Sequence, residues 1–246
     1  MKNLENKIAI ITGGNSGIGY ATAKQLISDG AKVIITGRRL EAIEQAANEL
    51  GAIPFLADQA NVNDIDKLHN YIKKEYGKVD ILFINAGITG TTNPIENTSN
   101  ENFDRVMNIN FRGAYFTLSK FIPLLNEGAS VVFLSSNVAS TNIANSSVYQ
   151  ASKAAINSIA KTAAAELASR NIRVNMVSPG PTRTNVLSKS YDETTAKSIW
   201  DNLADTIPLK KIGNPEDVAT MVAYLCYDSA SFITGAEFLI DGGMNL

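Results

Sequence analysis

The sequence predicts an α/β protein built on a doubly wound parallel sheet of seven strands, with helices on both faces. Short apolar, β-branched runs recur along the chain and are continuous rather than alternating, which is typical of parallel strands buried on both faces. Segments with apolar residues at helical spacing separate these runs, and this alternation implies right-handed crossovers. We expect strands at Lys7–Ile11, Lys32–Thr36, Ile53–Ala57, Val79–Ile84, Ser130–Leu134, Ile172–Val177 and Glu237–Ile240.

Two helix starts carry capping signals. Thr98–Glu101 has the residue pattern of a capping box. Asn214–Asp217 reads as an N-cap followed by proline and by acids in the first turn. Long helices are expected from Phe103 to about Leu125 and from Tyr149 onward. The segment at about 185–208 interrupts the strand–helix alternation and is interpreted as helical.

Composition favours a single cytoplasmic domain over residues 1–246. The length of 246 residues suits one α/β domain, and 45% hydrophobic residues are enough for a large core. A net charge of −2 without a basic block argues against nucleic-acid binding. We expect no signal peptide, and no apolar run approaches the ~18 residues that span a bilayer. The single cysteine, Cys226, rules out an intramolecular disulfide and fits a reducing compartment.

A glycine-rich turn, Thr12–Gly19, follows the first strand and leads into a helix. A dinucleotide pyrophosphate needs backbone N–H donors at a helix N-terminus and no side chains in the way. Gly13, Gly17 and Gly19 meet this need, although their spacing differs from the commoner G-x-G-x-x-G pattern. The position between strand and helix favours dinucleotide binding over a plain βα turn.

The second strand ends at Thr36-Gly-Arg38-Arg39. NAD-selective sites place an acidic residue near this point to bind the adenosine ribose hydroxyls. Here two arginines stand in its place, suited to charge-assisted contacts with a 2′-phosphate. We therefore expect NADP(H) as cofactor. The alternative is that both arginines are a solvated helix start, although cations are unfavourable there.

Tyr149 and Lys153 lie four residues apart at the start of a helix and share one of its faces. A free tyrosine has a pKa of about 10 and is a poor base at neutral pH. A nearby ammonium favours the phenolate and lowers that pKa, which makes the phenol usable for proton transfer. The alternative is that the pair has no catalytic role, with the tyrosine buried in the core and the lysine at the surface.

Taken together, these motifs resemble the short-chain dehydrogenase/reductase family over essentially the whole chain. The resemblance rests on order and spacing, which match at Thr12–Gly19, Asn85-Ala86-Gly87, Asn110, Ser136, Tyr149-x-x-x-Lys153, Pro179-Gly180, Thr234-Gly235 and Asp241–Gly243. It implies a Rossmann-type fold and hydride transfer between the nicotinamide and a carbonyl or secondary alcohol.

The resemblance also implies roles for four residues. Tyr149 is the acid/base that protonates the carbonyl oxygen during reduction. Ser136, thirteen residues earlier, hydrogen-bonds and orients that oxygen. Lys153 binds the nicotinamide ribose and lowers the pKa of Tyr149. Asn110 helps to hold a water that links Lys153 to solvent.

Other positions are implied to contact the cofactor. Asp58 corresponds to an aspartate that contacts adenine, but the residues that follow it, Gln59-Ala-Asn61, depart from the family's usual Val-Thr-Asp-like run. Thr184 is the hydroxyl expected at the carboxamide, while Asn85, Pro179 and Gly180 also make turns. Besides Tyr149 and Lys153, the expected cofactor-binding residues are Gly13, Asn15, Ser16, Gly17, Ile18, Gly19, Arg38, Arg39, Asp58, Gln59, Asn85, Ala86, Gly87, Pro179, Gly180, Thr182 and Thr184.

The substrate side is less defined by the sequence. The segment at about 185–208 could close over substrate as a lid and exclude water. In the alternative, its apolar residues Ile199, Trp200 and Leu203 anchor a surface helix to the core. Asn137, Val138, Asn142 and Ile143 are further candidates for the pocket. No arginine or lysine stands out as a receptor for a charged substrate, so we expect a neutral carbonyl or alcohol.

The remaining expectations concern metals, assembly and the alternative function. His69 is interpreted as part of a polar helix face and Cys226 as a packed apolar residue, so no metal site is expected. The resemblance implies a homotetramer or homodimer, formed through the two long helices and the last strand. A non-catalytic NADP(H)-binding sensor is the alternative function. The complete set of Asn110, Ser136, Tyr149 and Lys153 argues against it, because a sensor needs no proton donor.

Overall fold

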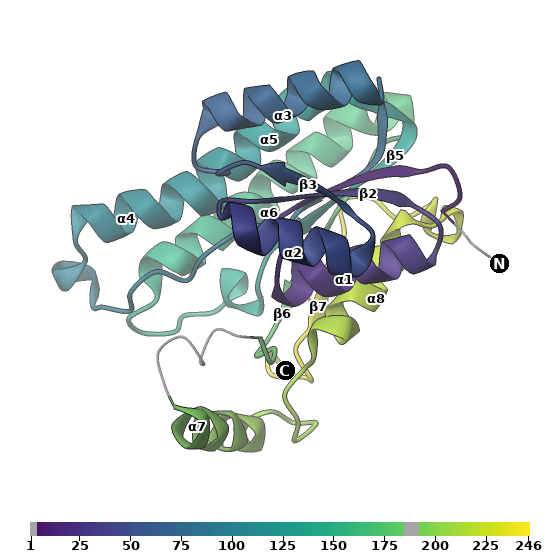
Figure 1. Cartoon of the computed structure of the whole chain (residues 1–246). Helices are drawn as coiled ribbons and strands as arrows, with labels where there is room; N and C mark the ends of the chain where they lie inside the picture. The colour runs from purple at the N-terminus through teal and green to yellow at the C-terminus, as the bar shows by residue number, and fades with distance from the viewer. Residues whose placement is uncertain (1–3, 185–191) are drawn as a thin grey trace.

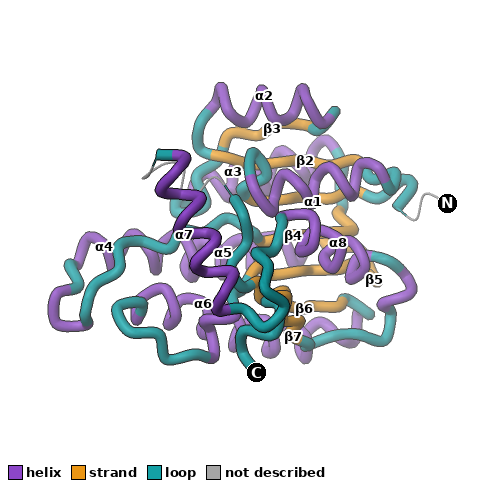
Figure 2. Tube along the Cα trace, turned by 90° about the horizontal axis from the view of Figure 1, so that it is seen from below, coloured by secondary structure: helices purple, strands orange, loops and turns teal. Residues whose placement is uncertain are grey.

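The computed structural model describes residues 4–184 and 192–246. Its centre is a sheet of seven parallel strands in the order β3-β2-β1-β4-β5-β6-β7, which confirms the doubly wound sheet (Figure 1). In Figure 2 the sheet runs from β3 at one edge to β7 at the other. The strands are β1 (Ile8–Thr12), β2 (Lys32–Gly37), β3 (Ile53–Leu56), β4 (Val79–Ile84), β5 (Leu125–Leu134), β6 (Arg173–Pro179) and β7 (Glu237–Ile240).

Helices cover both faces of the sheet because successive strand residues point to opposite sides. Ile10 of β1 packs with α3, α5 and α6, whereas its neighbour Ile11 packs with α1, α2 and α8. Figure 1 shows these two groups of helices on opposite sides of the strands. The helices are α1 (Gly17–Ser28), α2 (Leu40–Leu50), α3 (Val62–Glu75), α4 (Asn100–Met107), α5 (Ala114–Phe121), α6 (Ser147–Leu167), α7 (Glu193–Thr206) and α8 (Pro215–Cys226).

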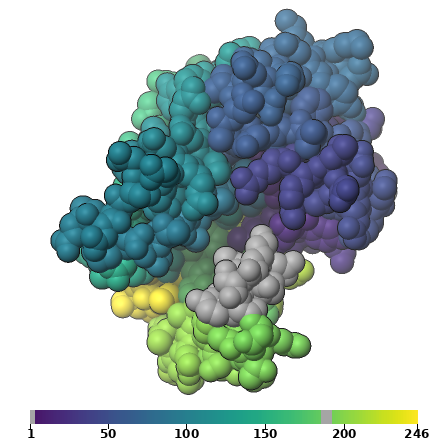
Figure 3. Space-filling view, turned by 60° about the vertical axis from the view of Figure 1, so that its left-hand side comes forward, coloured from purple at the N-terminus to yellow at the C-terminus, as the bar shows by residue number. Residues whose placement is uncertain are grey.

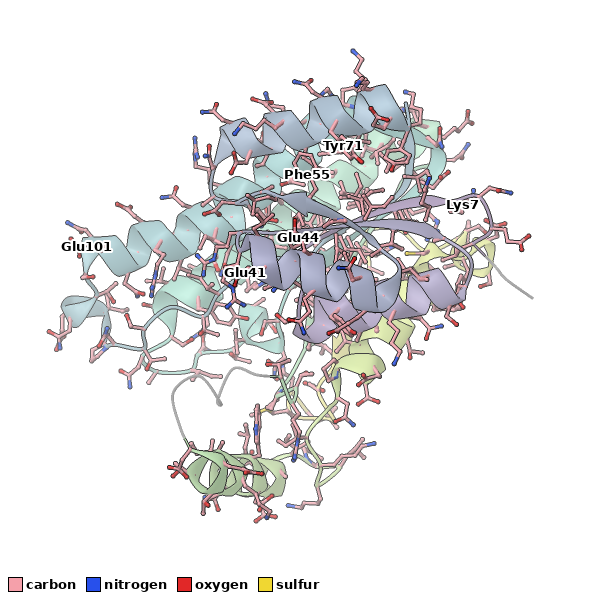
Figure 4. The ribbon with its side chains drawn as sticks, viewed as in Figure 1. Lys7, Glu41, Glu44, Phe55, Tyr71 and Glu101 are labelled. Atoms are coloured by element: carbon pink, nitrogen blue, oxygen red, sulfur yellow. The ribbon has the colours of Figure 1, made fainter. Side chains whose placement is uncertain are left out.

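The edge strand β3 is held to its helix by aromatic packing. The rings of Phe55 on β3 and Tyr71 on α3 lie together with their centroids 5.1 Å apart (Figure 4). Residues on this short strand alternate between exposed and half-buried, as expected at a sheet edge that only one neighbour covers.

The structure differs in two ways from the single long helix expected from Phe103 to about Leu125. It begins at Asn100, and a π-helical turn at Asn108–Gly113 separates α4 from α5. The turn lies against the chain after β3, so close that a Cβ on Gly113 would collide with the carbonyl oxygen of Gln59. After a single 3-10 turn at Ile122–Leu124, β5 begins at Leu125, five residues before the expected Ser130.

One predicted cap is correct and the other is shifted. The N-cap at Asn214 is confirmed, and the structure adds a capping box, in which the Asn214 N–H donates to Asp217 Oδ2 at 2.7 Å. At α4 the N-cap is Ser99, whose Oγ accepts from the Asn102 N–H at 3.2 Å. The expected box at Thr98 is therefore wrong by one residue, because the helix starts one residue later.

Helix α7 stands apart from the two main cores. Trp200 is 9% exposed and packs with Ile207, Ile212, Leu203 and Met244 in a small cluster of its own. Figure 3 shows this helix, in green, as a lobe beside the yellow C-terminal residues. Trp200 and Leu203 thus hold the helix to this small cluster and not to either main core. Of the expected lid, residues 185–191 lie outside the described part of the chain.

None of the described helices combines the length and the apolar character that crossing a bilayer requires.

Candidate active site

The expected site residues follow strands that meet at one edge of the sheet. β1 pairs with β2 on one side and with β4 on the other, so the chain order reverses between β1 and β4. Ligands of doubly wound sheets bind outside the carboxyl ends of the strands at such a point. The glycine-rich turn, Asn85, Ser136 and Pro179 come at or directly after the ends of β1, β4, β5 and β6.

The glycine-rich turn is tied to the loop after β4. Thr12 Oγ1 accepts from the N–H groups of Asn85 and Ala86, each at 3.0 Å. Asn85 Nδ2 donates back to the carbonyl oxygens of Thr12 and Gly13 at 2.8 and 3.0 Å. Asn85 therefore fixes the turn through its side chain.

Its glycines let the turn fold tightly at the N-terminus of α1. Gly13 and Gly17 have positive φ angles of 67° and 55°, and a Cβ on Gly19 would collide with the carbonyl oxygen of Gly13. Ser16, the N-cap of α1, makes no side-chain capping bond. The first N–H groups of α1, at Gly17, Ile18 and Gly19, thus keep their capacity to bind an anion. Asn15 lies beside the end of β2, since its Oδ1 would be 3.0 Å from a Cβ on Gly37.

Arg38 and Arg39 follow β2 and are both exposed. Arg39 is the N-cap of α2, and its side chain makes no capping bond. Neither guanidinium forms an ion pair with another of the described residues. Both cations are therefore available at the edge where the adenosine end of a dinucleotide would lie.

Asp58 and Gln59 lie after β3 and differ in their burial and in their hydrogen bonds. Asp58 Oδ1 accepts from the Ala60 N–H at 2.9 Å, and the residue lines an open hollow that also contains Arg112. Gln59 is buried, and its Nε2 donates to the carbonyl oxygens of Ala86 and Ile109, each at 3.0 Å. Gln59 therefore contributes its side chain to the support of the loop after β4.

Tyr149 and Lys153 lie on the same side of α6, next to Ser136. The Ser136 hydroxyl lies close enough to the Tyr149 hydroxyl to influence its pKa, and Lys153 Nζ lies 5.9 Å from the centroid of the Tyr149 ring. Lys153 is 4% exposed, and its Nζ donates to the Leu134 carbonyl oxygen at 2.6 Å. A Cβ on Gly87 would lie 3.5 Å from this Nζ, so Lys153 also reaches the loop after β4.

Asn110 lies in the π-helical turn and connects that loop to α6. Its Oδ1 accepts from the Ile88 N–H, and its Nδ2 donates to the Ile88 carbonyl oxygen, each at 2.8 Å. The same Nδ2 lies 3.0 Å from Ser152 Oγ, which donates to the Tyr149 carbonyl oxygen at 2.7 Å. The four residues expected to carry the chemistry are thus brought together.

Burial sets the ionisation of the two central groups. It raises the pKa of Tyr149 above its ordinary value, and the hydrogen bond with Ser136 opposes this increase. It lowers the pKa of Lys153 from 10.5 to about 8. In the protein alone, desolvation therefore outweighs the lowering of the Tyr149 pKa that the sequence spacing suggested.

Comparisons with known proteins agree with this geometry. A family model described as enoyl-(acyl carrier protein) reductase matches residues 13–245. The chain is 36% identical over 251 residues to a 3alpha-hydroxysteroid dehydrogenase from Mediterraneibacter gnavus, with 97% of each chain covered. It is 32% identical to a cyclohexanol dehydrogenase from an Acinetobacter species, with 96% of this chain and 94% of the relative covered. The chain belongs to the short-chain dehydrogenase/reductase family.

Solved structures support the same assignment. A short chain dehydrogenase/reductase family protein superposes with a TM-score of 0.87 at 34% identity, covering 99% of this chain and 100% of the other. A blue fluorescent protein from a metagenomic library, solved in complex with NADPH, gives 0.90 at 28% identity with the same coverage. This short-chain dehydrogenase/reductase is an oxidoreductase acting on alcohol or carbonyl substrates, and its family uses NAD(P)(H).

The loop after β6 approaches the glycine-rich turn of this short-chain dehydrogenase/reductase. A Cβ on Gly17 would lie 3.3 Å from Thr184 Cγ2. Thr182 Oγ1 donates to the Gly180 carbonyl oxygen at 3.0 Å, and a Cβ on Gly180 would lie 2.7 Å from Asp241 Cβ. Thr184 is therefore near the expected cofactor, whereas Gly180 is required by packing against the C-terminal segment.

Three supporting residues escaped the sequence analysis. Ser152 links Asn110 to Tyr149, Asn102 holds the loop at Thr91 through both of its amide atoms, and Asn245 exchanges two hydrogen bonds with Asn137. Of these three residues, only Ser152 could have been found from the sequence, because it directly precedes Lys153. The other two act across distances in the sequence that no spacing pattern reveals.

Two residues outside the site are placed by the structure. Cys226 is buried, and burial raises its pKa to about 12, so the thiol stays protonated as expected for a packed residue. His69 is half-buried on α3 beside Asn70. No group of acids, cysteines and histidine among the described residues is arranged to hold a metal ion.

Proposed function

We propose that the protein is an NADP(H)-dependent carbonyl reductase in which Tyr149 transfers the proton. The observation that carries this proposal is the cluster of Ser136, Tyr149 and Lys153 beside the loop after β4, with Asn110 bonded to both that loop and α6.

The cofactor side rests on the glycine-rich turn and on the arginines after β2. The glycine-rich turn suits a pyrophosphate, because Gly19 allows the turn to pack tightly against Gly13 and the uncapped N–H groups at the start of α1 can bind an anion. Arg38 and Arg39 supply the positive charge that a 2′-phosphate requires. They stand where NAD-selective sites have an acidic residue. When bound, the nicotinamide supplies the hydride.

The protein supplies orientation and a proton. Ser136 holds the carbonyl oxygen, and Tyr149 donates its hydroxyl proton to that oxygen as the hydride reaches the carbon. A phenol with the ordinary pKa of about 10 is protonated at neutral pH, which is the form that reduction requires. Lys153 places a cation beside the phenolate that remains and beside the expected nicotinamide ribose.

Replacing the phenol tests this mechanism. Tyr149→Phe removes the proton donor and keeps the ring, so we expect kcat for carbonyl reduction to fall about 10²–10⁴-fold. NADPH affinity, measured by fluorescence titration, should stay nearly unchanged. Tyr224→Phe, at an exposed tyrosine on α8, is the matched control and should keep full activity. A Tyr149→Phe enzyme that reduces carbonyls as fast as the parent would refute the mechanism.

A further inference from the structure

Residues Asp241–Leu246, which follow β7, form a turn that we call the C-terminal hook. The Asp241 carboxylate shapes it, since Oδ1 accepts from the Gly243 N–H at 2.9 Å and Oδ2 accepts from the Asn245 N–H at 3.1 Å. Gly242 and Gly243 have φ angles of 67° and 88°, in the region that favours glycine. The hook therefore fixes the backbone from which the Asn245 side chain extends.

The C-terminal hook is held on two sides. The backbone of Gly180, in the loop after β6, packs so closely against Asp241 that a Cβ there would lie 2.7 Å from Asp241 Cβ. On the other side, the Leu209 N–H donates to the Gly242 carbonyl oxygen at 3.1 Å, and Met244 packs against the cluster that anchors α7. Figure 3 shows the yellow C-terminal residues beside the green lobe of this helix. The hook is thus itself fixed and can hold another segment in place.

Asn245 binds the loop after β5 from this hook. Its Nδ2 donates to the Asn137 carbonyl oxygen at 3.0 Å, and its Oδ1 accepts from Asn137 Nδ2 at 3.2 Å. Ser140 Oγ also donates to that carbonyl oxygen, but at 3.5 Å this contact is weak. Asn137 is 5% exposed, so the loss of Asn245 as a partner would leave buried polar atoms unpaired.

Asn137 directly follows Ser136 in the chain, so the amide pair acts next to a residue of the site. Before Ser136, the Ser135 N–H donates to the Val177 carbonyl oxygen on β6 at 2.8 Å. After it, Asn245 holds Asn137. The backbone of Ser136 therefore lies between two fixed points. Its hydroxyl is one rotatable bond away from that backbone, so a shift of Asn137 would redirect the hydroxyl.

We propose that Asn245 is a positioning residue for carbonyl reduction, whose amide holds Asn137 so that the Ser136 hydroxyl stays directed at the substrate oxygen. In this role Asn245 acts through Asn137 rather than on the reacting atoms. The inference rests on the proposed function, in which Ser136 holds the carbonyl oxygen. A misplacement of about 1 Å near a reacting group can lower the rate about a hundredfold, so two hydrogen bonds at this place are enough to affect turnover.

The first test is Asn245→Leu, which removes both side-chain hydrogen bonds at similar volume and keeps the backbone N–H that binds Asp241. The probes are cyclohexanone, benzaldehyde and an ortho-quinone, and the one that the wild type reduces fastest is used throughout. We expect kcat to fall about 10–100-fold, with the KM for NADPH nearly unchanged. Asn48→Leu, at an exposed asparagine on α2, is the matched control and should keep full activity. Enzyme is counted by its NADPH-binding sites, so unfolded protein does not contribute, and an unchanged kcat in Asn245→Leu would overturn the inference.

A second substitution separates positioning from a general loss of structure. Ser136→Ala removes the hydroxyl on which Asn245 is proposed to act, and single-turnover reduction with enzyme in excess measures the slow rate that remains. Adding Asn245→Leu to Ser136→Ala should cause little further loss, because the two changes disable one unit. An equally large loss with and without the Ser136 hydroxyl would overturn the positioning role. No reduction of any probe by the wild type would overturn the proposed function, and this inference with it.

Discussion

Lys153 illustrates how burial acts on a single residue. Its ammonium is surrounded by protein, and the contact that holds it is the Leu134 carbonyl oxygen rather than a carboxylate. Burial without a paired anion disfavours the charged form, which is why the pKa of Lys153 falls to about 8. The folded protein therefore gives up this proton more readily than the unfolded chain does.

This difference predicts a pH dependence of stability. From about pH 8 to 10.5 the unfolded chain binds the proton and the folded protein does not, so stability rises with pH in this window. We expect the free energy of unfolding of the wild type to increase relative to that of Lys153→Met from pH 8 upward, and the difference to stay constant below pH 8. Urea unfolding of the cofactor-free proteins measures it. Lys161→Met, at an exposed lysine on α6, should show no such change, and parallel curves for Lys153→Met would contradict the assignment.

The prediction that the enzyme prefers NADPH over NADH depends on Arg38. A charge-assisted contact to the 2′-phosphate contributes about 1.5–3 kcal/mol, so Arg38→Asp should raise the KM for NADPH roughly ten- to hundredfold. The KM for NADH should change much less, because NADH lacks that phosphate. Steady-state kinetics with both cofactors measure the two values. Arg105→Asp, at an exposed arginine on α4, is the control. Equal changes for NADPH and NADH would remove Arg38 from this role and favour the solvated helix start.

At the scale of elements, the site depends on the π-helical turn between α4 and α5. Such turns are rare and occur frequently at functional sites. Here the turn carries Asn110 and packs Gly113 against Gln59. Gln59 is the link between this turn and the loop after β4, because one nitrogen serves the carbonyl oxygens of both Ile109 and Ala86.

We expect Gln59→Met to loosen this link. The substitution keeps the volume and leaves two carbonyl oxygens without their donor, which should lower the free energy of unfolding by about 1–3 kcal/mol. It should also weaken NADPH binding, since Ala86 and Gly87 lose their support. Urea unfolding and NADPH titration measure the two effects. Gln45→Met, at an exposed glutamine on α2, should change neither. NADPH affinity equal to that of the wild type would limit Gln59 to a role in stability.

At the scale of the whole molecule, the strand order places the carboxyl ends of β1, β4, β5 and β6 side by side. Apolar residues remain exposed on the last strand and before it, at Leu239 and Phe232. They agree with the predicted role of the last strand in assembly, and the homotetramer stays a prediction. The lid at about 185–208 also stays a prediction. In its described part, α7 is anchored by Trp200 to its own small cluster.

The order of strands and helices was readable from the sequence because continuous apolar runs and helical periodicity report burial directly. The spacing of Tyr149 and Lys153 was readable too, since both lie on one helix, and the glycine-rich turn follows its strand without interruption. Helix starts were less reliable, as the shift from Thr98 to Ser99 shows, because neighbouring hydroxyls can cap equally well.

The chain by itself determined the sheet and the family, and it predicted the reacting groups, since each of these depends on patterns of residues that are close along the chain. Only the tertiary structure decided the direction of the Tyr149 pKa and the support that Gln59 and Ser152 give. Desolvation and hydrogen bonding depend on which distant segments come into contact, and that information arises when the chain folds.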